Sequence, residues 1–99
     1  MTTILDVNGY KIGSVANDGR VLSKANTPIG RVDISGEILN YAGTKVGTFK
    51  PDGNVFKAGV YVGDVKTDGK VYDKDNDYVG RVKGAHTISA GAALLLLII

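Results

Sequence analysis

The residue types that carry most enzyme chemistry are scarce in this 99-residue chain. It holds one histidine, His86, one glutamate, Glu37, and no cysteine. Acid–base and nucleophilic catalysis need several titratable groups that converge on a substrate. The chain also lacks the Gly-x-Ser-x-Gly, His-Glu-x-x-His and phosphate-loop motifs. We therefore expect no enzyme activity and no catalytic residue, and we interpret His86 as a structural residue.

A second candidate for chemistry is the acidic run Asp-Lys-Asp-Asn-Asp at residues 73–77. Carboxylates at alternate positions are typical of the first half of a calcium-binding loop. The second half is missing, because Tyr78 stands where the loop glycine is expected and Gly84 where the bidentate glutamate is expected. Turns between strands also favour Asp and Asn, so we predict a turn here and expect no metal and no cofactor.

Aromatic side chains are the remaining candidates for ligand binding. Tyr10, Tyr61 and Tyr78 stand shortly before regularly spaced glycines. This placement favours packing between hairpins, with the hydroxyl at the surface. Exposed rings on short hairpins also suit stacking on sugars, so Tyr61 and Tyr78 are the candidate ligand-binding residues. A carbohydrate- or envelope-surface-binding module is the alternative function.

Charge and composition restrict the partners. Twelve basic and ten acidic residues give a formal charge of +2, and the basic residues are scattered along the chain, so we expect no nucleic-acid partner. The absence of cysteine excludes disulfides and thiolate metal sites. The first residues lack the basic and apolar regions of a secretory signal, so we expect a cytoplasmic location and leave envelope association open.

A repeated sequence pattern predicts the strands and turns that carry the candidate residues. The pattern apolar-Gly-x-apolar-x-x-x-Gly-x-apolar fits four times, and a shortened fifth copy follows. The leading glycines are 17, 17, 16 and 17 residues apart, namely Gly13, Gly30, Gly47, Gly63 and Gly80. Residues 1–84 are therefore predicted to form an all-β domain of five hairpin repeats, a meander of about ten short antiparallel strands.

The second glycine of each full repeat predicts a turn. If Val15 pairs with Val21, the loop between their neighbours has three residues, 17–19. Its third residue must adopt a left-handed conformation, which glycine tolerates. Equivalent loops are expected at residues 34–36, 51–53 and 67–69, with Pro51 at a position that favours proline. The turn glycines are Gly19, Gly36, Gly53 and Gly69.

The leading glycines lie inside strands, where glycine is unfavourable unless a bulge, a sharp bend or the close approach of another backbone requires it. The apolar residues around the first one, Ile12 and Val15, are three positions apart. Strict alternation would place them on opposite faces. We therefore expect a bend at this glycine or a two-sided core.

The composition changes after Gly84, and residues 85–99 form a second segment, an apolar tail. We predict a helix over residues 90–99 with Ser89 as its N-cap. Such a helix would be apolar on every side and must be covered. It could form the core of a homo-oligomer, pack on its own sheet, or enter a membrane, for which the twelve residues 88–99 are short of the roughly 20 needed. The oligomer interpretation is preferred, and its contact residues would be Ala92, Ala93, Leu94, Leu95, Leu96, Leu97, Ile98 and Ile99.

These features resemble a known family. Repeated Ile/Val-Gly-x-Val with Asp-Gly turns, followed by an Ala-rich run into leucines, is similar to the bacterial four-fold β-flower proteins. The Ile-Gly-x-Val pattern is also similar to PRC-barrel domains, but five evenly spaced copies favour the first family. The resemblance implies a homotetramer with splayed hairpins and tails gathered near the four-fold axis, and no assigned function.

We therefore expect a homo-oligomeric structural or interaction module without a catalytic site, whose partner is itself. Glycan binding through the tyrosines is the alternative. Peripheral membrane attachment through the tail is the third option.

Overall fold

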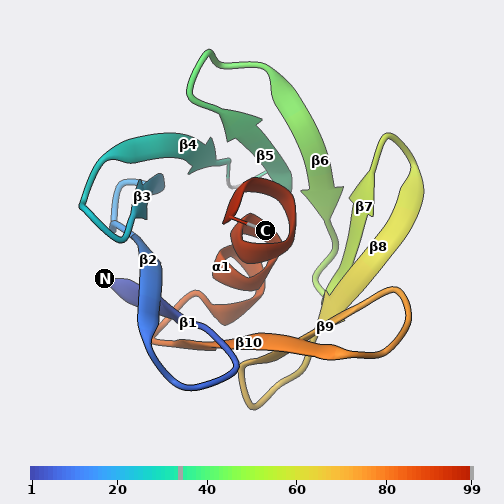
Figure 1. Cartoon of the computed structure of the whole chain (residues 1–99). Coiled ribbons are helices and arrows are strands. Elements are labelled where there is room, and N and C mark those ends of the chain that lie inside the picture. The colour runs from blue at the N-terminus through green and yellow to red at the C-terminus, as the bar shows by residue number, and fades with distance from the viewer. Residues whose placement is uncertain (34, 99) are drawn as a thin grey trace.

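The structure, a computed structural model, describes residues 1–33 and 35–98 and is a closed antiparallel β-barrel with a helix inside it (Figure 1). Over these residues ten strands follow one another around the wall, and β1 closes the ring by pairing with both β2 and β10. The predicted all-β meander with a short C-terminal helix is confirmed. The elements are β1 (Thr2–Leu5), β2 (Lys11–Val15), β3 (Arg20–Ser23), β4 (Pro28–Val32), β5 (Glu37–Asn40), β6 (Lys45–Phe49), β7 (Asn54–Lys57), β8 (Val60–Val65), β9 (Lys70–Asp73), β10 (Tyr78–Lys83), α1 (Thr87–Ala93) and η1 (Leu94–Ile98).

Five hairpins build the described wall, and each contains one leading glycine. They are β1–β2, β3–β4, β5–β6, β7–β8 and β9–β10. Figure 1 shows their turns projecting outward from the axis like petals. We call these five the outer turns, and we call the turns between successive hairpins the inner turns.

The inner turns have the predicted three-residue form. Val15 pairs with Val21, and the backbone N–H of Ala16 donates to the Arg20 carbonyl at 2.8 Å. The N–H of Gly19 donates back to the Ala16 carbonyl at 2.9 Å. The turn glycines have φ between +91° and +100°, as the left-handed position requires: Gly19, Gly36, Gly53 and Gly69.

Each turn glycine also joins its turn to the next hairpin. The N–H of Val32, for example, donates to the Gly19 carbonyl at 2.7 Å, and the same bond recurs at Gly36, Gly53 and Gly69. In the second inner turn the predicted residue Ile34 lies outside the described residues. Each inner turn is therefore also hydrogen-bonded to the second strand of the hairpin that follows it.

Most outer turns are held by one polar side chain at the end of the preceding strand. An oxygen of this side chain accepts backbone N–H groups two and four residues later, at Asp6, Ser23, Asn40 and Asp73. Asp73 Oδ1 accepts from Asp75 at 2.9 Å and from Asp77 at 3.0 Å. The turn predicted for residues 73–77 is therefore confirmed.

A β-bulge stands directly before every leading glycine. In the first hairpin Ile4 pairs with Gly13 and Leu5 with Lys11, so Ile12 is the extra residue. Since a bulge resets the alternation of side chains, Ile12 and Val15 both contact the core. The predicted irregularity at the leading glycine is therefore present. The bulge residues are Ile12, Ile29, Val46, Val62 and Val79.

The leading glycines form five sockets for five consecutive tail residues. The pairs are Leu94 with Gly80, Leu95 with Gly63, Leu96 with Gly47, Leu97 with Gly30 and Ile98 with Gly13. A Cβ on Gly47 would lie 2.5 Å from the Phe56 carbonyl oxygen and 2.6 Å from Leu96 Cδ1. A larger residue therefore does not fit at this position, because neighbouring backbone and the tail both approach it.

The five-fold wall also accounts for the shape of the tail. Five hairpins are about 72° apart around the axis, whereas successive residues of an α-helix are about 100° apart. The wider π-helix, with i→i+5 hydrogen bonds, turns less per residue, so five consecutive residues of η1 can each face one hairpin. The predicted cap at Ser89 is wrong: α1 begins at Thr87, and Ser89 Oγ donates to the His86 carbonyl at 3.2 Å.

Candidate functional site

The two ends of the barrel differ in character. The helix α1 begins among the inner turns, at what we call the loop end. The π-helix η1 ends among the outer turns, at the opposite end, which we call the apolar end (Figure 1). Each end presents a candidate site.

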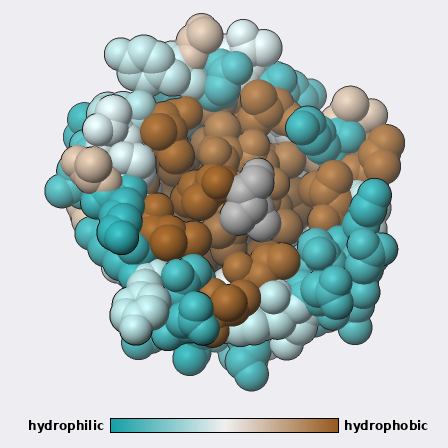
Figure 2. Space-filling model, in the orientation of Figure 1, coloured by the Kyte–Doolittle hydropathy of each residue, from teal (hydrophilic) through white to brown (hydrophobic). Residues whose placement is uncertain are grey.

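The apolar end is a patch built from two sets of half-buried side chains. The five bulge residues form its outer ring, and Leu95, Leu96, Leu97 and Ile98 form its centre. Figure 2 shows this patch as a continuous apolar area surrounded by hydrophilic residues. The bulges create it, because each one turns an apolar wall residue inward beside the tail.

Charged side chains of both signs surround the apolar end on the outer turns. The β9–β10 turn is acidic, because it carries Asp73, Asp75 and Asp77 against Lys74. Other hairpins carry a lysine at or next to the outer turn: Lys11, Lys24, Lys45 and Lys57. Lys45 Nζ lies 3.3 Å from Glu37 Oε2. The charge of this rim is therefore uneven around the ring.

The tail residues predicted to contact other subunits divide into three groups. Ala92, Ala93 and Leu94 are completely buried inside their own barrel. This corrects their expected place in an oligomer core, because five hairpins of the same chain already surround them. Leu95, Leu96, Leu97 and Ile98 are only partly buried, at the apolar end. Ile99 lies outside the described residues.

Tyr61 and Tyr78 lie on the outer wall, each 38% exposed. Tyr61 packs edge-on against Phe56, with ring centroids 6.1 Å apart, and Tyr78 packs against Tyr72 at 5.8 Å. Each contact crosses an outer turn and joins two consecutive copies of the repeat, as predicted for these two tyrosines. Tyr10 is 69% exposed on its outer turn.

Asp64 connects the two aromatic pairs. The Tyr61 hydroxyl donates to Asp64 Oδ1 at 3.1 Å, and Lys66 Nζ lies 2.7 Å from Asp64 Oδ2 and 5.7 Å from the centre of the Tyr72 ring. Burial and the hydrogen bond to Asp64 raise the pKa of Tyr61 above its usual value. The hydrogen bond to Asp64 also raises the pKa of Lys66.

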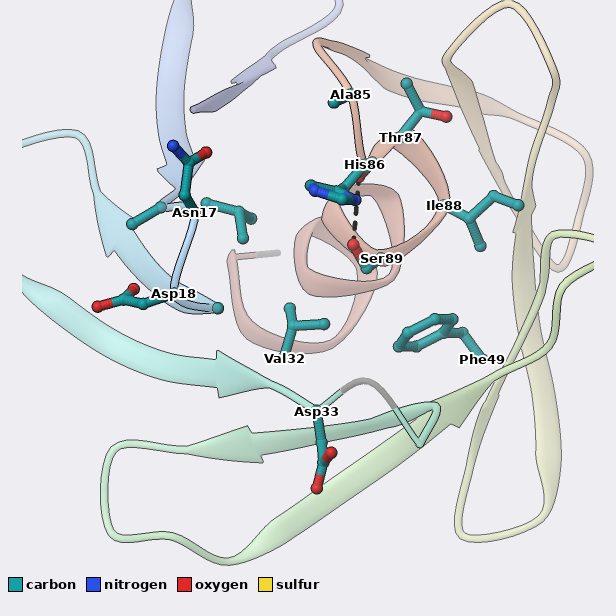
Figure 3. Close-up of a pocket in the computed structure, with 13 residues that line it drawn as sticks. Asn17, Asp18, Val32, Asp33, Phe49, Ala85, His86, Thr87, Ile88 and Ser89 are labelled. Carbon is teal, nitrogen blue, oxygen red and sulfur yellow. Dashed lines mark hydrogen bonds between the residues drawn. The ribbon is translucent and has the colours of Figure 1, made fainter.

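A cavity of about 540 Å³ opens at the loop end, between α1 and the first three hairpins (Figure 3). Its wall contains Val15, Val32 and Phe49, and its helix side contains Ile88 and His86. The sequence placed His86 beside the tail but gave no indication of a cavity. An available signal was Phe49, which stands where the other four hairpins have a valine.

In the part of the chain that the structure describes, no three His, Cys, Asp or Glu side chains gather closely enough to hold a metal ion. Among the same residues, no helix has the length and apolar character needed to cross a membrane. Comparison of the chain with protein-family models, curated proteins and solved structures found no significant match.

Proposed function

We propose that this chain is a homo-oligomeric structural or interaction module that binds further copies of itself through the apolar end, without a catalytic site. The observation that supports this is the contiguous patch formed by the bulge residues and the outer part of η1. Large contiguous apolar patches on soluble proteins mark interaction surfaces. The tail then contributes twice, because it fills the barrel and completes the surface.

The size of this end suits a protein contact. The molecule measures 29 × 29 × 21 Å. A disc 29 Å across has an area of roughly 660 Å², close to the ~800 Å² that each partner contributes to a standard stable interface. The sockets beneath the patch are filled by the tail, so the patch offers a broad face and no deep pocket.

The rim charges favour a second copy as the partner. When two copies meet face to face about a two-fold axis, the same patch serves both. The acidic β9–β10 turn of each copy can then lie opposite a lysine-bearing turn of the other, for example the one that carries Lys57. Charges of both signs steer such pairing, whereas attraction to an anionic lipid surface needs a basic cluster.

The resemblance to four-fold β-flower proteins implies four subunits. One contact between apolar ends joins two copies, so a tetramer requires a second contact outside this surface. The mass in solution distinguishes the two states.

The test is light scattering after size exclusion at several protein concentrations without detergent. We expect a discrete multimer for the unaltered chain and a shift to monomer for Val46→Glu, which places a charge in the patch. Ala85→Glu, at an exposed position of the loop end, is the matched control and should keep the multimer. Val79→Lys provides a second patch variant in case Val46→Glu does not fold, which circular dichroism would reveal.

A chain that is monomeric at every concentration contradicts the proposal. So does an unaltered chain that needs detergent or floats with liposomes, because the apolar end would then bind lipid. Truncation after Gly84 does not test self-association alone, because it also removes the side chains that fill the five sockets inside the barrel.

The exposed aromatic wall supports glycan binding as a second candidate. Asp64 lies between two aromatic pairs, so a ring face and a carboxylate are close together. Sugars are commonly bound by such a combination of a stacking ring and a hydrogen-bonding group. Loss of glycan-array binding in the double variant Tyr61→Ala, Tyr78→Ala, with Tyr41→Ala as control, would support it.

A further inference from the structure

The cavity at the loop end arises because α1 does not lie on the barrel axis. The helix packs most closely against β8, β1 and β10, and less closely against β6 and β4. Gly91 makes this possible: a Cβ at this position would lie 2.9 Å from Val65 Cγ1, so only glycine lets the helix approach β8 this closely. The displacement toward β8 leaves space on the opposite side, beside β2, β4 and β6.

Equivalent wall residues show the effect of this displacement. Val65 and Val82, on the side that the helix covers, are only 4% and 2% exposed. Val32 and Phe49 occupy the same repeat position in the second and third hairpins and are only half-buried. They line the cavity together with Ile88 of the helix. Two apolar wall residues are therefore left without the cover that their counterparts have.

The volume and shape of the cavity suit a small organic molecule. Its 540 Å³ lies within the range of about 300–1,000 Å³ that is usual for ligand sites. The Phe49 ring supplies a flat apolar surface and Val32 and Ile88 supply aliphatic contact, as Figure 3 shows from one side. Aromatic guests gain from an offset or edge-on ring contact of this kind.

Polar groups restrict the charge of the guest. His86 projects into the space beside α1 and offers a hydrogen-bonding imidazole (Figure 3). Asp18 and Asp33 stand at the rim, and no lysine or arginine lines the cavity. The Arg20 guanidinium lies with its Nε 2.9 Å from Asp18 Oδ2 and compensates part of the charge of this carboxylate. Asp33 therefore contributes most of the repulsion that an anionic guest would meet.

We propose that this cavity is a binding site for a small planar aromatic molecule that is neutral or cationic. The ring lies between Val32, Phe49 and Ile88, and a hydrogen-bonding group of the guest meets His86. This site is at the opposite end of the barrel from the surface proposed for self-association, so the two proposals are independent.

The test is a titration of the full chain with indole, followed by NMR chemical shifts. We expect saturable shifts at the backbone amides of the cavity lining, and weaker shifts at the same positions with benzoate, whose charge the Asp33 carboxylate opposes. Val32→Phe fills the cavity with a residue that the barrel already accepts at the same position of the third hairpin. It should weaken indole binding about tenfold or more.

Val7→Phe is the matched control, because it makes the same substitution on an outer turn where Val7 is 52% exposed. Its affinity for indole should equal that of the unaltered chain. If Val32→Phe does not fold, Phe49→Val, which installs the valine of the other hairpins, removes the aromatic contact and should also weaken binding. Unchanged affinity in the folded variants, shifts confined to the apolar end, or no saturable shift would each overturn the proposal.

Discussion

At the scale of single residues, the leading glycines show how two parts of the chain restrict one position. Gly47 is confined by the Phe56 carbonyl on the wall and by Leu96 of the tail. We predict that Gly47→Ala destabilises the fold by about 2–3 kcal/mol, because both neighbours must shift. Urea denaturation would measure this loss.

The control for this variant is Gly43→Asn on an outer turn. Gly43 has φ +85° and nothing within 4 Å of a Cβ, and Asn26 and Asn76 adopt the same conformation in other outer turns. Its stability should therefore change by less than about 0.5 kcal/mol. If Gly47→Ala were equally mild, the socket interpretation would fail. Partial recovery in the double variant Gly47→Ala, Leu96→Ala would confirm that the tail forms part of the socket.

Tyr61 gives the fold a dependence on alkaline pH. Its pKa is raised by burial and by Asp64, so above about pH 10 the folded chain keeps a proton that the unfolded chain loses. Stability from this group is complete below its usual pKa and is lost as the pH rises through the raised value. The free energy of unfolding should therefore fall less steeply between about pH 9 and 11 in Tyr61→Phe.

Lys66 contributes in the same direction, because its pKa is raised as well. Some alkaline loss of stability should therefore remain in Tyr61→Phe. Tyr41→Phe, at a position 78% exposed, is the control and should follow the unaltered chain. Identical pH profiles for all three proteins would show that Tyr61 does not contribute.

At the scale of elements, one side-chain oxygen organises most of the outer turns. Asp73 accepts two backbone N–H groups, and Ser23 does the same in the second hairpin. We predict that Asp73→Ala costs about 1–2 kcal/mol of stability, whereas Asp73→Ser costs less than half of that. Thermal unfolding followed by circular dichroism would rank the variants, and equal losses would contradict the shared role.

Turns and strands could be predicted because glycine spacing specifies them locally. The left-handed position at Gly19 and the irregularity before Gly13 each follow from a few neighbouring residues. The helix type could not be predicted, since an Ala/Leu run favours an α-helix by local propensity. The π-helix follows from the match between five tail side chains and five hairpins, which appears only when both are in place.

At the scale of the whole molecule, the sequence predicted a meander but not its closure. Closure depends on pairs such as Ile4 with Val82, which lie at opposite ends of the described strands and share no local signal. The tail was expected mainly between subunits, and the barrel interior that receives it exists only after closure. The cavity at the loop end was also missed, because it depends on how closely Gly91 approaches Val65.

The closed ring has a consequence for how the molecule opens. In an open sheet the outermost strand can peel away while the others stay paired, and its free edge can then recruit a strand from another chain. Here every strand pairs with two neighbours. The first opening must therefore separate two paired strands and, at the same time, weaken the contacts between the leading glycines and the tail. The barrel interior is therefore exposed only when the strands and the tail separate together. Because the closed barrel has no unpaired strand edge, it gives a strand of another chain no edge to pair with.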